Sequence, residues 1–563
     1  MYILGICDSQ DAGAVLLSRQ SLEIIAVNEE RLSRIKLQGG FPVLSIKEVL
    51  GLKKIKPEDI SLVAAASDMT PAFILRLFSQ SHAKLRSSNK QFSFLLAGYI
   101  TYQVLAEKLI FPKKIEAFLS RWVLSRKLSS LGINAKVITI DHHTAHAYAG
   151  YSICGFDKAL IITIDGLGDG VSFTVNIGQN GAIKPVFRQS ALSDITLYYS
   201  RLTEFLGFKP IQDEGKVMGL AAYAEKYFAR EQANKLLRVS KGRFKPKNPF
   251  AKDKKLFAQL SKISKQEVAG SFQKHAEDCL EKVVAYWVEK TGIAKVVLSG
   301  GFFANIKVNQ KIAERARVEA VFICPHMGDG GLALGAAFSV KKAKPFQVKH
   351  VFWGPSYSDQ QIQQTLEAMK IEYIKPKQIQ IQIAELLSQK KIVARFSGAM
   401  EFGPRALGNR SILAQATDIS MQNYLNQKLG RDGFMPFGPS ILEEDKAICC
   451  LGIEKAEDSA RFMNISFKAT DYFQKTCPAA VHKDGTTRPQ FVSSYFNNDF
   501  YKILKQYKQI TNIPALLNTS FNLHEEPIVC SPQDAINSFQ KSRIDYLAIG
   551  DFLVKRSNDE EKK

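Results

Sequence analysis

The sequence lacks two features that define large classes of proteins. It contains no run of about 18 consecutive apolar residues, the length that a membrane-spanning helix needs. Its eight cysteines are scattered and include no CxxC pair, which argues against a zinc ribbon and against a disulfide-stapled fold. Residues 1–13 carry no basic segment ahead of their apolar run, so we expect a β-strand there and no signal peptide. These absences favour a reducing compartment, and we expect a cytoplasmic protein.

Acidic residues are too few to balance the basic ones. The 563 residues include 76 Lys and Arg against 54 Asp and Glu, which gives a net charge of +22. Most of the excess falls in residues 76–127, with ten basic and two acidic residues, and in residues 226–265, with thirteen and two. Such a charge first suggests nucleic acid, a membrane surface or anionic substrates. No RNA-binding module accompanies it, so a nucleic-acid partner is not expected.

The first basic stretch has an unusual composition between residues 91 and 124. Aromatic and aliphatic residues there alternate with four Lys and Arg, in runs too short and too interrupted to span a bilayer. Three interpretations are open. The segment could form two helices packed on its domain with solvated basic faces, a peripheral contact with lipid headgroups at the inner membrane face, or a flap over the substrate. The second stretch, 226–265, is typical of a solvated loop or insertion.

Apolar runs alternate with helical patterns along the first 340 residues, which predicts an α/β architecture. Strands are predicted at 2–6, 14–17, 24–28, 62–65, 136–140, 159–164, 171–177, 295–299 and 320–324. We expect a first domain at 1–345, a linker at 346–360 and a second α/β domain at 361–563. Strands of the second domain are expected near 371–374, 391–396 and 515–518. No internal repeat is evident.

Three glycine-containing turns follow predicted strands of the first domain. They span 5–14, 165–170 (DGLGDG) and 299–305 (SGGFFAN). Glycine lets backbone N–H groups approach a phosphate without a Cβ in the way, although tight turns need glycine in any case. Two of these loops carry Asp, and the set resembles the phosphate and adenosine loops of the sugar kinase/Hsp70/actin fold.

Three of the nine histidines lie within five residues, at His142, His143 and His146. If the segment is helical, His142 and His146 are four residues apart and share a face, so both imidazoles can reach one metal ion. Asp165 and Asp329 follow strands and could complete the site. Such a ligand set suits Fe(II), Mn(II) or Zn(II), and the alternative is a polar helix start with surface histidines. His143 faces elsewhere, where it could contact substrate or act as an acid or base.

Nine stretches, taken in order, resemble the O-carbamoyltransferase family that includes nodulation protein NodU and the tobramycin, novobiocin and cephamycin enzymes. The stretches are NEERLSRIK, HHTAHA, ITIDGLGDG, DEGKVMGLAAYA, LSGGFFANIKVN, GDGGLALGAA, EFGPRALGNRSIL, HKDGTTRPQFV and LLNTSFNLHEEPIVCSPQDA. The resemblance covers nearly the whole chain. It implies a TsaD-like first half with the sugar kinase/Hsp70/actin fold and a YrdC-like α/β second half.

The resemblance also implies a two-step reaction. The YrdC-like domain converts carbamoyl phosphate and ATP, bound with Mg²⁺, to carbamoyladenylate and pyrophosphate. The TsaD-like domain, with Fe(II), passes the carbamoyl group to an acceptor hydroxyl and releases AMP. The expected acceptor is a sugar, a glycolipid, a polysaccharide precursor or a natural product. The protein could form a homodimer.

Roles of individual residues follow from the same resemblance. The implied metal ligands are His142, His146, Asp165 and Asp329. The implied catalytic residues of the second domain are Arg405, Arg431, Arg488, Asn518 and Ser520. The candidate nucleotide contacts of the first domain are Gly166, Gly300, Gly301, Asn305, Glu214 and Lys216. Guanidinium groups suit these substrates because they bind phosphate oxygens in a bidentate manner. The candidate bases for the acceptor hydroxyl are His143 and Asp11.

The sequence departs from the family pattern at two places. Gln10 stands where the family usually has His, and Met435 stands where it has a second Arg. The family Lys near Leu429 is also absent. We interpret these changes as a different way of holding phosphate, with altered adenylation as the alternative. Two other functions compete with the main prediction, namely a tRNA-modifying enzyme and a non-catalytic regulator that binds metal and nucleotide.

Overall fold

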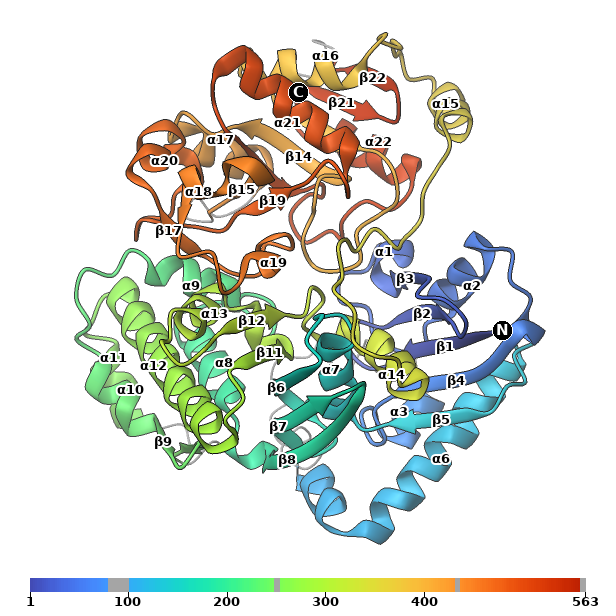
Figure 1. Ribbon diagram of the computed structural model, residues 1–563, viewed down its shortest axis with the longest axis vertical. Helices are drawn as coiled ribbons and strands as arrows, with labels where there is room; N and C mark the ends of the chain where they lie inside the picture. Colours follow the sequence, from blue (N-terminus) through green and yellow to red (C-terminus); the bar gives the residue numbers. More distant parts are fainter. Residues whose placement is uncertain (79–100, 248–253, 431–435, 557–563) are drawn as a thin grey trace. The chain divides into compact units, whose positions relative to one another are not determined.

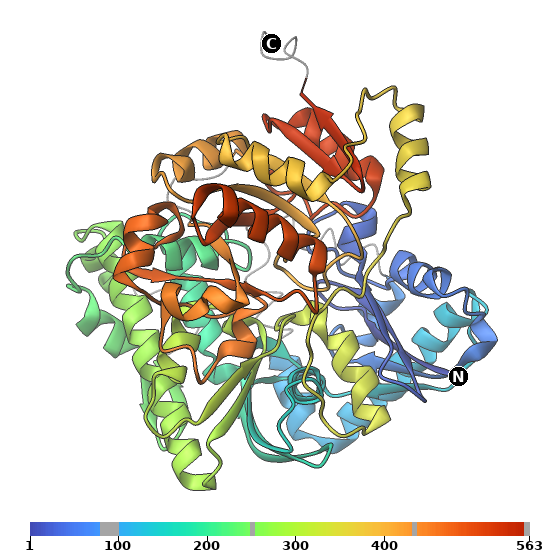
Figure 2. The ribbon, with the colours of Figure 1, turned by 45° about the horizontal axis from the view of Figure 1, so that its top comes forward.

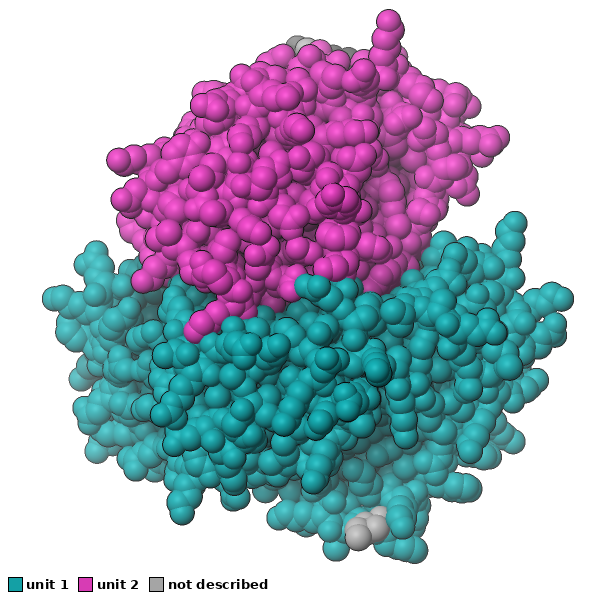
Figure 3. All heavy atoms as spheres, in the orientation of Figure 1, with its two compact units in different colours: residues 1–33, 37–348 teal, residues 34–36, 349–563 magenta. Residues whose placement is uncertain are grey.

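A computed structural model describes residues 1–78, 101–247, 254–430 and 436–556. The chain divides into two compact units, shown in different colours in Figure 3. The N-terminal unit contains residues 1–33 and 37–348, and the C-terminal unit contains residues 34–36 and 349–563. The linker expected at 346–360 includes this boundary.

The first sheet of the N-terminal unit has the strand order β3-β2-β1-β4-β5. β1, β2 and β3 are antiparallel neighbours, whereas β4 and β5 run parallel to β1. Every residue of β2 and β3 is buried, which explains why these strands appear in the sequence as nearly continuous apolar runs. The strands are β1 (Tyr2–Cys7), β2 (Gly13–Ser18), β3 (Ile24–Asn28), β4 (Ile60–Ala66) and β5 (Val137–Ile140).

A second sheet repeats this topology with the order β12-β11-β6-β7-β8. Three antiparallel strands again come first along the chain, and two parallel strands follow. The strands are β6 (Lys158–Gly168), β7 (Val171–Gln179), β8 (Ala182–Ser190), β11 (Lys295–Ser299) and β12 (Ala320–Ile323). The α/β class predicted from the sequence is confirmed, and a doubled sheet of this order is the arrangement of the sugar kinase/Hsp70/actin fold. Two sheets can adopt the same strand order when their strands share a pattern of buried residues, even if the residues themselves differ. The sequence therefore shows no repeat.

Two helices, α7 (His142–Tyr151) and α14 (Leu332–Lys341), lie between the two sheets (Figure 1). α7 contacts β6 and β11, α14 contacts β1 and β4, and the two helices contact each other. They approach closely at Gly335, where an added Cβ would lie 1.8 Å from the carbonyl oxygen of Ala145. This close packing fixes α7, which carries the three histidines, between both sheets.

The other helices of the N-terminal unit surround the sheets. A two-stranded ribbon, β9 (Leu237–Ser240) and β10 (Arg243–Pro246), lies within the second basic stretch. No helix among the described residues is long and apolar enough to cross a membrane. The helices are α1 (Glu29–Ser33), α2 (Val43–Leu52), α3 (Phe73–Leu77), α6 (Ile110–Ser129), α8 (Ile195–Phe205), α9 (Glu214–Ala221), α10 (Arg230–Leu236), α11 (Lys254–Leu260), α12 (Lys265–Thr291) and α13 (Ile306–Ala313).

The C-terminal unit is built on a mixed seven-stranded sheet of order β19-β15-β20-β14-β13-β21-β22. Helices α16 (Ile379–Ser388) and α21 (Asn498–Thr511) pack together against it, as Figure 1 and Figure 2 show, and share one apolar core with its strands. The strands are β13 (Val393–Phe396), β14 (Arg410–Gln415), β15 (Gly438–Leu442), β19 (Gln490–Val492), β20 (Ala515–Ser520), β21 (Tyr546–Ile549) and β22 (Phe552–Lys555).

The strand expected at 371–374 is wrong. Only Ile374 pairs, through a single antiparallel bridge to Leu553. Pro376, which has no backbone N–H to donate, follows two residues later, and a strand ladder cannot extend through it. Ile374 is 60% exposed, so the apolar residues here do not define a buried face.

Candidate active site

Helix α7 begins directly after β5 because Asp141 caps it. The Asp141 carboxylate accepts hydrogen bonds from the backbone N–H of Thr144 at 3.1 Å and from the guanidinium of Arg188 at 2.8 Å. Asp169 fixes the first helical residue, since its Oδ2 accepts from the backbone N–H of His142 at 2.9 Å. Asp169 belongs to the DGLGDG loop, but its role at the start of α7 could not be read from the sequence.

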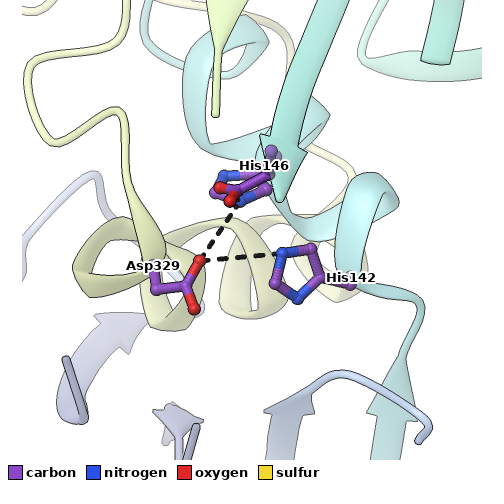
Figure 4. Close-up of side chains that lie close together, drawn as sticks. His142, His146 and Asp329 are labelled. Atoms are coloured by element: carbon purple, nitrogen blue, oxygen red, sulfur yellow. Dashed lines mark ion pairs between the residues drawn. The ribbon is translucent and has the colours of Figure 1, made fainter. Parts of the chain in front are cut away.

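The structure brings together all four predicted metal ligands. One ligand atom from each of His142, His146, Asp165 and Asp329 lies within 4.8 Å of the others. His146 Nε2 lies 2.9 Å from Asp165 Oδ2 and 3.6 Å from Asp329 Oδ1. His142 Nε2 lies 3.7 Å from the same Asp329 oxygen, and Figure 4 shows both imidazoles directed at this carboxylate.

The surroundings of these side chains fit a bound metal ion. His142 and His146 are fully buried, and His142 Nε2 has no hydrogen-bond partner among the described residues, while His146 Nε2 faces the carboxylate oxygens of Asp165 and Asp329. Buried polar atoms left unpaired are costly, and a metal ion would satisfy them. The other nitrogen of His142, Nδ1, lies 2.9 Å from Ser67 Oγ, which orients the ring as outer partners of metal-binding histidines do.

Electrostatic interactions with their neighbours shift the pKa values of His146 and Asp165. Burial lowers the pKa of His146, but the carboxylates of Asp165 and Asp329 outweigh burial and raise that pKa to about 9. Burial alone would raise the pKa of Asp165, yet His146, His142 and the backbone N–H of Gly301 hold it well below its usual range. Two imidazoles and two carboxylates thus converge on one point, and a positive charge is favoured there.

The predicted glycine loops support this cluster. The backbone N–H groups of Gly301 and Gly166 donate to Asp165 at 3.0 and 2.6 Å. Gly300 has φ 105°, and an added Cβ would lie 2.1 Å from the carbonyl oxygen of Ile164, so only glycine fits there. Asn305 caps α13 through the backbone N–H of Val308 at 3.2 Å.

His143 does not occupy the position expected of an acid or base. Its Nδ1 lies 2.7 Å from Thr163 Oγ1, and its Nε2 lies 3.0 Å from the carbonyl oxygen of Val171. Burial, together with His142 and His146, lowers its pKa to about 3. Both ring nitrogens of His143 therefore already have partners within the protein.

Asp11 lies near a histidine that sequence reasoning missed. Its Oδ2 is 3.9 Å from Nε2 of His326, a buried residue whose pKa is lowered to about 3 by burial and by Arg31. His326 Nε2 also lies 3.1 Å from Asn28 Oδ1. The proximity of His326 to Asp329 in PHMGDGG was the available signal in the sequence.

Glu214 and Lys216 lie on α9, away from α7 in the chain. Glu214 Oε1 accepts from Ser200 Oγ at 3.2 Å and from the backbone N–H of Ile211 at 2.5 Å, and burial raises its pKa. Lys216 Nζ lies 3.3 Å from Asp213 Oδ1. Glu214 thus has partners on α8 and in the turn before α9, and Lys216 has its partner at the end of that turn.

In the C-terminal unit, Arg405 and Arg488 lie close enough to interact electrostatically. Burial lowers the pKa of Arg405 to about 10, and burial together with the charge of Arg405 lowers the pKa of Arg488 well below its ordinary value. Neither guanidinium forms an ion pair with a carboxylate among the described residues, and Arg405 Nε has no hydrogen-bond partner there. Two half-buried like charges without a described carboxylate partner form a site that favours an anion.

Asn518 lies beside this pair. It is opposite Gly438 in the sheet, and a Cβ on Gly438 would lie 3.4 Å from Arg488 Nε. Asn518 Nδ2 donates to Ser440 Oγ at 3.0 Å, whereas its Oδ1 is buried without a described partner. Ser520 ends the same strand, β20. Arg431 and Met435 lie outside the described residues.

Comparison with known proteins decides the family. Residues 2–338 match the family "Carbamoyltransferase N-terminus", and residues 384–556 match the family "Carbamoyltransferase C-terminus". The chain belongs to the carbamoyltransferase family. It is 31% identical to nodulation protein NolNO of Sinorhizobium fredii, over 97% of this chain and 79% of that protein. It is 32% identical to an uncharacterised protein of Methanocaldococcus jannaschii, over 98% of this chain and 99% of that protein.

A second nodulation protein matches part of the chain. Nodulation protein U of Rhizobium tropici is 30% identical over 51% of this chain and 49% of its own length. Among solved structures, full-length HypF in a phosphate- and nucleotide-bound form aligns with a TM-score of 0.33 and 14% identity, over 61% of this chain and 46% of HypF. The resemblance to the carbamoyltransferase family found in the sequence is confirmed.

Proposed function

We propose that this carbamoyltransferase forms carbamoyladenylate in its C-terminal unit and transfers the carbamoyl group to an acceptor hydroxyl in its N-terminal unit. The family supports carbamoyl transfer in general. The observation that carries the finer proposal is the pair formed by Arg405 and Arg488, two half-buried cations without a described carboxylate partner. Carbamoyl phosphate and the triphosphate of ATP are the dense anions that such a pair would bind.

The chemistry of the first half-reaction assigns a task to each side chain. Water cleaves carbamoyl phosphate to carbamate and phosphate, and an oxygen of carbamate then attacks the α-phosphorus of ATP, which expels pyrophosphate. Arg405 and Arg488 stabilise the charge that develops on the phosphate oxygens. Asn518 Oδ1, buried without a described donor, would accept a hydrogen bond from the carbamate NH₂ group.

The second half-reaction belongs to the cluster on α7. His142, His146, Asp165 and Asp329 would hold Fe(II) or another divalent ion, which supplies Lewis-acid polarisation of a phosphate or carbonyl oxygen. Ser67 and Asp169 hold His142 in place. The acceptor oxygen attacks the carbamoyl carbon, the bond to AMP breaks, and the hydroxyl proton passes to a base.

We assign that base to Asp11, since both ring nitrogens of His143 are engaged. Asp11 lies in the loop between β1 and β2, two residues after Ser9. The Oγ of Ser9 donates to Asp329 Oδ2 at 3.3 Å, so this loop reaches the candidate metal ligands. A cytoplasmic location, a homodimer and Mg²⁺ bound with ATP remain predictions from the sequence.

The test measures pyrophosphate release from ATP and carbamoyl phosphate. Arg488→Ala should reduce the rate by about 100-fold or more, because a group that stabilises transition-state charge is lost. Arg543→Ala is the matched control, since Arg543 is an exposed arginine of the same unit, and it should keep the wild-type rate. A wild-type rate in Arg488→Ala would contradict the proposed site.

A further inference from the structure

Helix α6 is apolar on two opposite sides. Its inner side packs in the core of the first sheet, where Leu124 and Leu128 are fully buried among residues of β1, β2 and β4. Figure 1 shows α6 beside β5, the edge strand of that sheet. A helix that only covers a sheet needs one apolar face, so the second face requires another explanation.

The second face consists of four large side chains, which we call the outer stripe. Their spacings of four, three and four residues place them on one side of the helix. They are exposed by 75%, 44%, 62% and 46%, in the order Phe111, Ile115, Phe118 and Trp122. Single exposed apolar residues are common, but an aligned row of three aromatic residues and one aliphatic residue indicates an interaction site.

Along α6, cations border the outer stripe, and the single acid of this helix does not. Lys114 and Arg126 are exposed on the same side of α6, and the guanidinium of Arg126 lies 4.6 Å from the ring centre of Trp122. The one acidic residue of α6, Glu116, points inward, where it is 3% exposed and accepts from the backbone N–H of Phe73 and from Tyr102 Oη. The outward side of α6 is therefore aromatic and positively charged.

We propose that the outer stripe attaches the protein to the surface of an anionic membrane. Aromatic and aliphatic side chains enter the boundary between headgroups and acyl chains, and flanking Lys and Arg bind the anionic headgroups. The stripe lies along a single helix at the edge of its sheet, a shape that suits an extended lipid surface. Its positive border complements anionic lipid. This inference goes beyond carbamoyl transfer and does not depend on it.

The experiment is flotation of the full-length protein with vesicles, without ATP or carbamoyl phosphate. Vesicles of phosphatidylglycerol and phosphatidylcholine in equal parts should bind the protein at least about tenfold more strongly than phosphatidylcholine alone. The double variant Phe118→Ser/Trp122→Ser should bind the anionic vesicles at least about tenfold more weakly than the wild type, because apolar insertion is lost. The charge variant Lys114→Glu/Arg126→Glu should lose the preference for anionic lipid while keeping the inner face of α6 intact.

The matched control is Leu22→Ser/Leu44→Ser, which removes two exposed leucines of the same unit, 48% and 41% exposed, outside α6. It should bind vesicles as the wild type does. The emission of Trp122 should shift to shorter wavelength on binding, whereas buried Trp287 should not respond. Absence of vesicle binding, or undiminished binding by both stripe variants, would overturn the proposal. The proposal would also be overturned if the wild type bound no lipid but formed a dimer that the stripe variants convert to a monomer.

Discussion

Replacing Asp169 by Asn should weaken metal binding in the N-terminal unit and leave the adenylation half-reaction intact. Asp169 is fully buried. Its Oδ2 accepts from the backbone N–H groups of Asp68 and His142, both at 2.9 Å, and its Oδ1 accepts from that of Met69 at 2.8 Å. One carboxylate thus ties the start of α7 to the turn that follows β4.

The size of the effect follows from the three amide donors. Asn has the same shape but only one acceptor oxygen. If that oxygen takes the place of Oδ2, it still accepts from Asp68 and His142, and the NH₂ group then faces the N–H of Met69. One hydrogen bond to a charged acceptor is then lost, which costs about 1.5–3 kcal/mol before the turn relaxes. Disturbed support of a metal-binding histidine lowers metal affinity by about 10–100-fold, which is the decrease we expect.

The assay titrates metal-free protein with Fe(II) under anaerobic conditions in competition with a chelator. Pyrophosphate release is measured on the same samples and should stay at the wild-type rate, because we assign this step to the C-terminal unit. Asp59→Asn, at an exposed acid of the same unit, serves as the control for the loss of one carboxylate. If Asp169→Asn binds Fe(II) as tightly as the wild type, Asp169 does not position His142 for a metal.

Three further results are expected. His143 has a pKa of about 3 when folded against an ordinary 6.5, so the unfolded chain binds the extra proton and stability falls as pH drops through this range. His143→Asn should therefore make urea unfolding less dependent on pH between about 6.5 and 4, and an unchanged dependence would contradict neutral burial. Gly335→Ala should lower the melting temperature because its Cβ meets the Ala145 carbonyl, whereas Gly51→Ala, with no atom within 4 Å, should not. Arg405→Lys should raise KM for carbamoyl phosphate about tenfold by losing bidentate contact, and steady-state kinetics with an unchanged KM would count against that contact.

Local patterns in the sequence were sufficient to select His142, His146 and Asp165 as candidate metal ligands. His142 and His146 are one helical turn apart, and Asp165 lies at the end of a strand that periodicity makes visible. Their meeting with Asp329, more than 160 residues further along the chain, follows once both sheets adopt the same order. The family resemblance added the roles of these residues but not their geometry.

Long-range packing explains what the sequence did not reveal. His143 differs from His142 only in its direction on α7, and its burial depends on Thr163 and Val171 in the adjacent sheet. Asp169 resembles any loop acid until the turn after β4 is placed beside it. The doubled sheet was hidden because equivalent strands share burial and not residue identity.

The most informative measurement is mass spectrometry of metabolite and glycan pools incubated with the enzyme, ATP and carbamoyl phosphate. A species should gain the mass of one carbamoyl group only when both cosubstrates are present. His142→Ala should abolish this gain while pyrophosphate release continues, and Arg488→Ala should abolish both. Carbamoylation that is unaffected by either substitution, or that proceeds without ATP, would contradict a two-site carbamoyltransferase.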